Sequence, residues 1–297
     1  NFKAKNKDNT DMFAPERSAI AIDIVRHVGD PIAIIIADTI EQAKNASELI
    51  DVDIEELPSV TSASEAIKDD APQVWNNSKN NTCFDWEMGE KEKVNKAFES
   101  AETVVEIELI NNRIVPNSME TRGAIASYNI ENNKYELRCS SQGVHSIRDR
   151  VSELLNIEAK DLRVITTDVG GGFGMKLFNY PEYICSLFAS KKVGRPVKWV
   201  SERTEAFLSD THGRDHVTKA KMALDKDGIF LGIKINTIAN LGAYLSNFAI
   251  FVPTLAGTAM LAGCYKTPAI YVNVLGVFTN TPAIDAYRGA GRPEASY

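Results

Sequence analysis

The stretch DVGGGFGMK, residues 168–176, places four glycines and a phenylalanine directly after a strand-like run, DLRVITT. Glycine lets backbone N–H groups approach a ligand closely, and a helix that follows points its positive end at that ligand. The stretch, called the glycine loop below, therefore predicts a seat for an anionic group or cofactor at Gly171, Gly172, Phe173 and Gly174. A tight turn that is merely rich in glycine is the alternative.

Two familiar phosphate-binding motifs do not fit the glycine loop. The GxGxxG pattern needs a third glycine where Leu177 stands. The P-loop needs a lysine directly after its last glycine and then Ser or Thr, but Met175 separates Gly174 from Lys176. Neither NAD nor ATP is therefore favoured as the ligand.

A second bare stretch is YRGAGRPE, residues 287–294, called the arginine loop below. Gly289, Ala290 and Gly291 lie between Arg288 and Arg292, and the planar guanidinium group suits phosphate. A surface turn with solvated arginines is the alternative. Two loops with so little side-chain bulk in one chain are hard to explain as independent turns. We therefore expect both loops to bind one large anionic cofactor, from two sides.

Gln142, in RCSSQGVHSIRDR, is expected at a strand end just before a helix, where its amide could donate a hydrogen bond into a pocket. His145 next to it is interpreted as a structural residue near a helix terminus. In PNSMETRG, Glu120 and Arg122 are expected to pair with each other and join two strands.

The polar cluster SDTHGRDH contains His212, Arg214, Asp215 and His216. Two histidines four residues apart suggest zinc if they share a helix face, but Gly213 between them favours a loop. Salt-bridged scaffolding is the preferred interpretation for Asp215.

Periodicity predicts the elements that must position these residues. Residues 31–38, 39–50 and 51–57 read as strand, helix and strand, with a capping box of Thr39 and Gln42. The polar stretch 68–81 predicts a loop and a domain boundary. Further on we expect strands at 103–111, 134–142, 161–169, 195–203 and 269–280, helices at 144–156 and 180–194, and a hairpin that turns at Asp227-Gly228.

Composition narrows the class of protein. The 297 residues carry a formal net charge of −7, which argues against a nucleic-acid partner because such binding depends on clustered Lys and Arg. The four cysteines are far apart, without zinc-ligand spacing, and predict buried thiols in a reduced, cytoplasmic protein without protein metal ligands. No apolar run reaches the length of a membrane span. The start without Met suggests an excerpt of a longer protein.

Taken together, the segments resemble the large, molybdenum-binding subunit of the xanthine oxidase and aerobic carbon monoxide dehydrogenase family of molybdenum hydroxylases. The resemblance rests on motifs in family order, quoted from this chain: VRHVGDPIAIIIADT, PNSMETR, SSQGVHSIRDRV, VGGGFGMK, GRPVKWVSERTEAF, SDTHGRD, ANLGAYLS and TNTPAIDAYRGAGRPEA. It implies an α/β (α+β) fold: residues 1–75 as the end of a small N-terminal hammerhead-like domain, and 82–297 as the first part of the domain that binds molybdopterin.

The resemblance also implies residue roles. Gln142 matches a glutamine beside the metal. A cofactor-binding loop of the family is matched by Gly171, Gly172, Phe173 and Gly174. A second loop, which contacts the cofactor from the other side, is matched by Arg288, Gly289 and Ala290. Arg214 stands where a substrate-side arginine occurs in several members.

The implied reaction is hydroxylation of a small aldehyde or N-heterocycle with water. The implied cofactor is molybdenum-molybdopterin, for which the cytosine dinucleotide form is one candidate. Electrons would pass to [2Fe-2S] clusters and FAD on partner subunits, in a dimer of heterotrimers. The glutamate base would lie beyond residue 297, so the piece alone is expected to be inactive.

Three positions depart from well-known members. Copper-containing carbon monoxide dehydrogenases have cysteine where this chain has Gly289, and xanthine-oxidising enzymes have glutamate at Leu177 and phenylalanine at Ala290. A substrate other than carbon monoxide or purine is therefore expected. A carbon monoxide dehydrogenase-like enzyme and a non-catalytic, cofactor-carrying half of a split subunit remain as alternatives.

Overall fold

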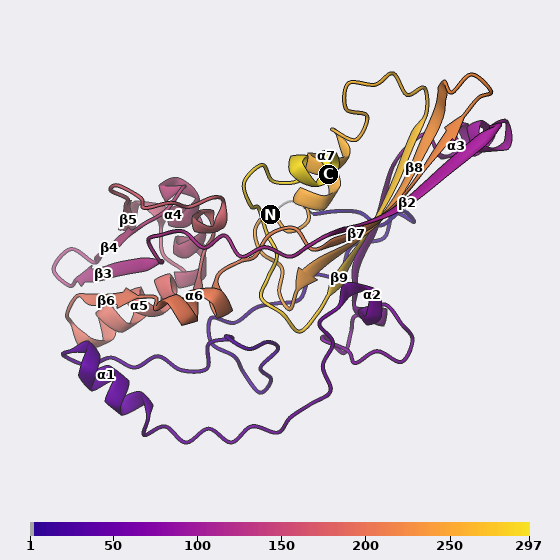
Figure 1. Ribbon diagram of the computed structural model, residues 1–297. Coiled ribbons are helices and arrows are strands. Elements are labelled where there is room, and N and C mark those ends of the chain that lie inside the picture. The colour runs from indigo at the N-terminus through magenta and orange to yellow at the C-terminus, as the bar shows by residue number, and fades with distance from the viewer. Residues whose placement is uncertain (1–2) are drawn as a thin grey trace. The chain divides into compact units, whose positions relative to one another are not determined.

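The computed structural model describes residues 3–297, which form two compact units (Figure 1). The first unit combines the described part of Asn1–Glu16 with Ser59–Pro116 and Thr211–Tyr297. The second unit combines Arg17–Pro58 with Asn117–Asp210. Each unit is therefore assembled from segments that are far apart in the sequence.

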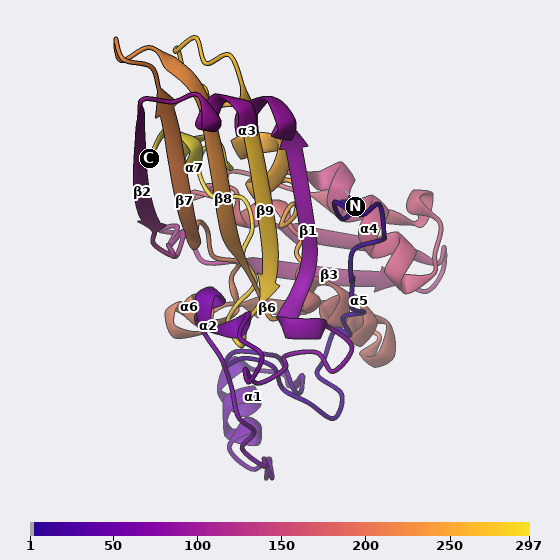
Figure 2. The same ribbon diagram turned by 90° about the vertical axis from the view of Figure 1, so that its right-hand side faces the viewer.

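The first unit contains a five-stranded sheet with the order β1-β9-β8-β7-β2 (Figure 2). Its strands are β1 (Thr82–Gly89), β2 (Thr103–Asn111), β7 (His216–Leu224), β8 (Phe230–Gly242) and β9 (Ile270–Phe278). Only the β8–β9 pair is parallel among these strands, which the structure describes in full. The predicted hairpin between β7 and β8 is confirmed, and Gly228 adopts a φ of +78° in its turn.

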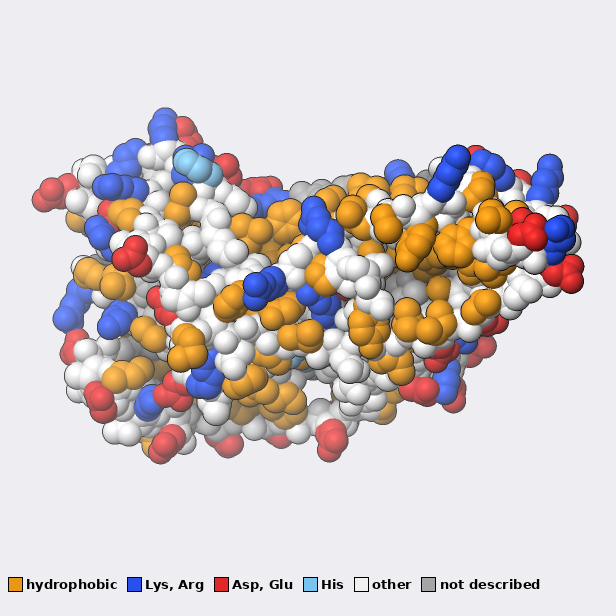
Figure 3. All heavy atoms as spheres, turned by 45° about the horizontal axis from the view of Figure 1, so that its top comes forward, with side chains coloured by type: hydrophobic (Ala, Val, Ile, Leu, Met, Phe, Trp, Pro, Cys, Tyr) orange, Lys and Arg blue, Asp and Glu red, His pale blue; other side chains and the backbone are white. Residues whose placement is uncertain are grey.

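The core of the first unit lies against this sheet. Phe84, Leu241, Val274 and Phe278 are almost completely buried in it. The shorter elements of the unit are α2 (Ala63–Ala66), η1 (Lys79–Asn81), α3 (Lys91–Glu99), the π-helical turn η4 (Val252–Ala256) and α7 (Arg292–Ser296). The edge strand β2 is much more open, with Val104, Val105, Ile107 and Ile110 all about half exposed. Figure 3 shows apolar side chains lying open over the strands of this sheet.

The second unit contains a four-stranded sheet with the order β5-β4-β3-β6. Its strands are β3 (Gly123–Asn129), β4 (Lys134–Cys139), β5 (Leu162–Ile165) and β6 (Val197–Val200). Its helical elements are α1 (Ile40–Ser47), α4 (Val144–Leu155), η2 (Ala159–Asp161), η3 (Met175–Leu177), α5 (Pro181–Val193) and α6 (Arg203–Ser209). Since β4 and β5 are parallel, α4 is the crossover between them.

The local signals for the helices of the second unit are confirmed. α5 begins at Pro181 and ends before Gly194, which is left-handed with φ +65°. α4 ends before a left-handed Asn156 and buries Ile147 and Val151. Helical spacing places Leu154 on the same face, but Leu154 is 61% exposed, so that face is only partly buried.

The predicted strand–helix–strand pattern near the N-terminus is only partly confirmed. α1 begins with the expected capping box, in which Thr39 Oγ1 accepts from Gln42 N and Gln42 Oε1 accepts from Thr39 N. Residues 31–38 and 51–57 form no strands, so that part of the prediction is wrong. An apolar β-branched run becomes a strand only when a neighbouring strand accepts and donates its backbone hydrogen bonds, and no described strand pairs with either run.

Among residues 3–297, no helix is both long and apolar enough to cross a membrane. Within the same range, no group of three or more His, Cys, Asp or Glu side chains is arranged to hold a metal ion.

Candidate functional site

The glycine loop lies in the second unit, between β5 and α5, and its backbone is unusual. Gly171, Phe173 and Gly174 have φ values of +97°, +54° and +104°. A left-handed phenylalanine is strained and needs support from its surroundings. In the described chain, the N–H groups of Gly171, Gly172 and Phe173 have no hydrogen-bond acceptor. The expected helix does not follow directly, because the short turn η3 comes before α5.

Gln142 lies between β4 and α4, before a helix as the sequence predicted, and its side chain lies against the glycine loop. Its Oε1 accepts a hydrogen bond of 2.9 Å from Gly174 N, and its backbone N–H donates to Lys176 O. A Cβ atom at Gly172 would lie only 2.4 Å from the same Oε1. Glycine at 172 therefore makes room for the Gln142 side chain, whose Nε2 has no acceptor among residues 3–297.

An ion pair between a buried lysine and an exposed glutamate holds the two ends of the glycine loop. Lys176 is completely buried, and its Nζ lies 2.7 Å from Oε2 of Glu120, whose side chain is 42% exposed. The same carboxylate oxygen accepts from Gly170 N at 2.8 Å, while Glu120 N donates to Gly170 O. Partial desolvation raises the pKa of Glu120, but these donors outweigh it and lower that pKa overall, so the carboxylate is charged at neutral pH.

Arg122 has other partners than the sequence predicted. Its guanidinium is completely buried and donates to Asp210 at 2.5 Å and to both oxygens of Glu182 at 3.0 Å. It also lies 3.6 Å from the ring centroid of Tyr180. The predicted pair of Glu120 with Arg122 is therefore wrong. The chain bends at residues 119–120 instead of running extended, and the two side chains form separate ion pairs with different segments.

The arginine loop lies in the first unit, and three successive residues in it have positive φ. Gly289, Ala290 and Gly291 have φ values of +97°, +46° and +88°, of which only that of Ala290 is strained. A Cβ at Gly291 would lie 2.4 Å from Val252 O, so the loop rests directly on the π-helical turn η4. The side chain of Arg288 is exposed and has no partner among residues 3–297.

Arg214 lies in the first unit too, and its side chain is only 7% exposed. Its guanidinium donates to Tyr287 O at 3.2 Å and to Arg288 O at 2.8 Å, and it lies 2.8 Å from Glu294 Oε1. Burial lowers the pKa of neighbouring His216, so at neutral pH that ring does not compete with Arg214 as a cation for Glu294.

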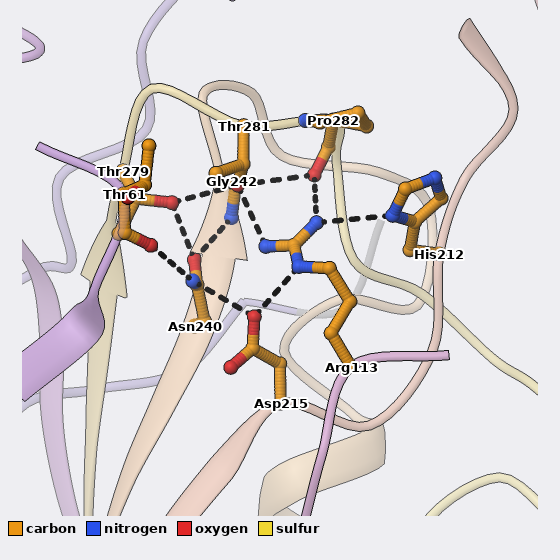
Figure 4. A network of polar contacts seen from close by, with 9 residues as sticks. All are labelled: Thr61, Arg113, His212, Asp215, Asn240, Gly242, Thr279, Thr281 and Pro282. Carbon is orange, nitrogen blue, oxygen red and sulfur yellow. Dashed lines mark hydrogen bonds and ion pairs between the residues drawn. The ribbon is translucent and has the colours of Figure 1, made fainter. Parts of the chain in front are cut away.

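A polar network anchors the segment that carries Arg214 (Figure 4). Arg113 donates to Asp215 Oδ2 at 2.7 Å, to Thr281 Oγ1 at 2.6 Å and to Pro282 O at 3.0 Å. Asn240 Nδ2 donates to the same Asp215 oxygen at 3.0 Å. The preferred interpretation of Asp215 as salt-bridged scaffolding is thereby confirmed.

The structure thus brings the predicted site residues together in two groups. Gln142 and the glycine loop meet in the second unit, and Arg214 and the arginine loop meet in the first. Some residues that form ion pairs around the site were not singled out from the sequence as site residues, among them Arg113, Lys176, Glu182 and Glu294. Of these four, only Lys176 and Glu294 could have been found from the sequence, because they lie within the glycine loop and the arginine loop.

The donors of each loop can be described by their chemistry. In the second unit they are the backbone N–H groups of Gly171, Gly172 and Phe173 and the side-chain amide of Gln142, and in the first unit the guanidinium of Arg288. Each of the two sets suits a ligand that carries anionic groups.

Comparison with known proteins agrees with this chemistry. The molybdopterin cofactor-binding domain family matches residues 74–297, and the hammerhead domain of aldehyde oxidase and xanthine dehydrogenase matches residues 1–58. The carbon monoxide dehydrogenase large chain of Hydrogenophaga pseudoflava is 33% identical over 283 residues, which cover 90% of this chain and 35% of that one. The nicotinate dehydrogenase large molybdopterin subunit of Eubacterium barkeri is 28% identical, over 98% of this chain and 67% of that one.

Solved structures show the same likeness. Quinoline 2-oxidoreductase from Pseudomonas putida 86 superposes with a TM-score of 0.86 at 32% identity, over 93% of this chain and 35% of that one. Aldehyde oxidoreductase from Desulfovibrio desulfuricans gives 0.87 at 25% identity, over 94% and 31%. The chain spans about a third of the length of most relatives named here. With a match over three quarters of its residues, and with a loop of bare N–H groups beside a glutamine amide, the chain belongs to the molybdopterin cofactor-binding domain family of the molybdenum hydroxylases.

Proposed function

We propose that the chain is the part of a molybdenum hydroxylase large subunit that holds the molybdopterin cofactor beside the substrate. The observation that carries this proposal is the glycine loop, in which the N–H groups of Gly171, Gly172 and Phe173 lack acceptors among residues 3–297 and flank the Gln142 amide. When bound, the cofactor would supply the two-electron oxidation that lets oxygen from water be transferred to carbon.

This chain's own residues would bind and orient the cofactor. The free N–H groups would donate to it, while Gln142 Nε2 would donate near the metal because Oε1 is already occupied by Gly174 N. Arg288 would neutralise anionic charge from the arginine loop. We further propose that residues 1–75 end a hammerhead domain and that 82–297 begin the cofactor domain, in keeping with the matched ranges 1–58 and 74–297.

The remaining features of the proposed enzyme are inferred from its resemblance to the family. We propose iron–sulfur and FAD partner subunits, a dimer of heterotrimers, the cytosine dinucleotide form of the cofactor and a cytoplasmic location. The glutamate base would come from the rest of the cofactor domain. All four cysteines are free thiols, which supports a reducing compartment. The expectation of buried thiols holds for Cys83 and Cys139 but is wrong for Cys185, which is half-buried, and for Cys264, which is exposed.

For the substrate we propose an aldehyde or N-heterocycle. Similarity to a quinoline 2-oxidoreductase and to an aldehyde oxidoreductase supports this class. Leu177 cannot orient a purine as a carboxylate would, and Gly289 cannot ligate copper. A second candidate is a non-catalytic half of a split subunit, favoured by the greater share, 67%, that the chain covers of the nicotinate dehydrogenase subunit.

The test is the molybdenum and pterin content of the complex purified with its own partner subunits from its own cells. We expect stoichiometric molybdenum, and its loss in Gly172→Val and in Arg288→Ala. Gly123→Val, at a glycine with ordinary φ and a neighbour no closer than 3.5 Å, and Arg163→Ala, at an exposed arginine, are matched controls that should keep the metal.

A complete and correctly folded complex without molybdenum would refute the proposal and leave a scaffold as the better description. Full cofactor content without turnover of any aldehyde or N-heterocycle would favour the split-subunit candidate.

A further inference from the structure

The Arg214 guanidinium contacts the arginine loop on both sides of its glycines. Before the glycines it donates to Tyr287 O and Arg288 O, and after them it pairs with Glu294 at 2.8 Å. The Glu294 side chain is 6% exposed, and neither of its carboxylate oxygens has a hydrogen-bond partner among residues 3–297, so its contact with Arg214 is an ion pair without an aligned hydrogen bond. Arg214 is therefore the charge that compensates this buried carboxylate, and one side chain holds both arms of the loop.

The arginine loop needs such a restraint at Ala290. Its φ of +46° is unfavourable for a non-glycine residue, whereas Gly289 and Gly291 on either side adopt positive φ without strain. The loop's internal hydrogen bonds include Ala290 N to Tyr287 O at 2.7 Å and a long one from Arg292 N to Gly289 O at 3.4 Å. Tyr287 O thus accepts from both the loop and Arg214.

The backbone of Arg214 is itself held in an unfavourable conformation. Arg214 and Asp215 have φ values of +65° and +69°, two non-glycine residues in succession. Asp215 is fixed by Arg113 and Asn240 through its side chain and by Asn111 O through its N–H (Figure 4). Gly213 is needed at the preceding position, because a Cβ there would lie 2.3 Å from Tyr287 Cβ. The network thus aims the Arg214 side chain at the loop.

We propose that Arg214 is a positioning residue that clamps the arginine loop, so that Arg288 and the glycine backbone are presented to the cofactor in one fixed conformation. The Arg113–Asp215–Asn240 network is the support of this clamp. This role needs no direct contact of Arg214 with substrate, since its Nη1 and Nη2 atoms already contact three protein oxygens. The inference rests on the proposed function for what the loop binds, but the clamp itself does not depend on it.

The test is amide hydrogen exchange, read by mass spectrometry on peptides covering residues 286–297, in the complete subunit with its partners. We compare Arg214→Met, Arg214→Lys, Glu294→Gln and the double variant Arg214→Met/Glu294→Gln. Arg195→Met is the matched control, because Arg195 forms an exposed ion pair with Asp38 in the second unit. Molybdenum content and the midpoint of global unfolding are measured on the same samples.

We expect exchange in the loop to rise about tenfold or more in Arg214→Met, because hydrogen bonds from a charged group are lost. Arg214→Lys should recover part of the protection, and Glu294→Gln should cost less than Arg214→Met. The double variant should exchange no faster than Arg214→Met alone, while Arg195→Met should match the wild type. Arg214→Lys and Glu294→Gln keep the test decisive if Arg214→Met does not fold.

Unchanged exchange in the loop, in Arg214→Met or in the milder variants, would overturn the clamp. Loss of molybdenum or of turnover with normal protection of the loop would instead indicate that Arg214 acts on a ligand directly. A wild-type complex without molybdenum would refute the proposed function alone, because the exchange comparison needs no cofactor.

Discussion

Gly172→Ala should disturb the glycine loop through one identified contact. The new Cβ would lie 2.4 Å from Oε1, 2.6 Å from Cδ and 2.9 Å from Cγ of Gln142. Gly172 does not have a positive φ, so alanine brings no backbone strain of its own. The Gln142 side chain must therefore move and give up its 2.9 Å hydrogen bond from Gly174 N.

The cost can be summed from three contributions. Loss of a neutral hydrogen bond costs about 1 kcal/mol, and a displaced side-chain rotamer costs about 1 kcal/mol. The alanine stabilises by about 0.7 kcal/mol because it restricts the unfolded chain. The free energy of unfolding should therefore fall by about 1 kcal/mol in Gly172→Ala.

A double-mutant cycle isolates this contact. In a Gln142→Ala background all three clashing atoms are absent, so Gly172→Ala should be neutral or slightly stabilising, which gives a coupling of about 2 kcal/mol. Equilibrium urea unfolding of the four proteins measures it. Gly123→Ala is the matched control, since its Cβ would be 3.5 Å from Trp199 O, an ordinary contact, and its effect should not depend on Gln142.

Equal effects of Gly172→Ala in the two backgrounds would refute the reasoning, because the cost would then arise from something other than the Gln142 side chain. A cost above about 3 kcal/mol in the Gln142→Ala background would show that the backbone at 172 tolerates no Cβ at all.

Two further predictions concern buried charges. Burial raises the pKa of Asp285 from its ordinary value of 3.8 to about 7, so the native state holds a proton that the unfolded chain releases. The resulting stabilisation of the native state is complete below about pH 4 and is lost as the pH rises to about 7. Stability of the wild type should thus fall relative to Asp285→Asn by a few kcal/mol between pH 4 and 7 in urea unfolding, and parallel curves for the two proteins would contradict this. Arg122→Met should lower the free energy of unfolding by about 3–5 kcal/mol because it leaves Asp210 and Glu182 buried without their cation. A loss below about 1 kcal/mol in the same measurement would mean that this guanidinium is not a structural anchor.

Much of the local structure could be predicted because its signals act between neighbours in the chain. The Thr39 and Gln42 capping box, the helix that starts at Pro181 and the turn at Gly228 each depend on backbone conformation within a few residues. The glycine loop and Gln142 could be placed at strand ends for the same reason. Their sequence context was also enough to indicate the cofactor family.

The sequence by itself therefore determined the local elements, the bare loops and their resemblance to a molybdopterin-binding domain. Only the tertiary structure decided the partners of the charged residues: Arg122 meets Asp210 across 88 residues of sequence, Lys176 meets Glu120 across 56, and Arg214 reaches Arg288 O across 74. Tertiary structure also left residues 31–38 without a strand partner. The physical reason is that a residue's type limits which bonds it can make, while the closure of distant segments around a core decides which of them form.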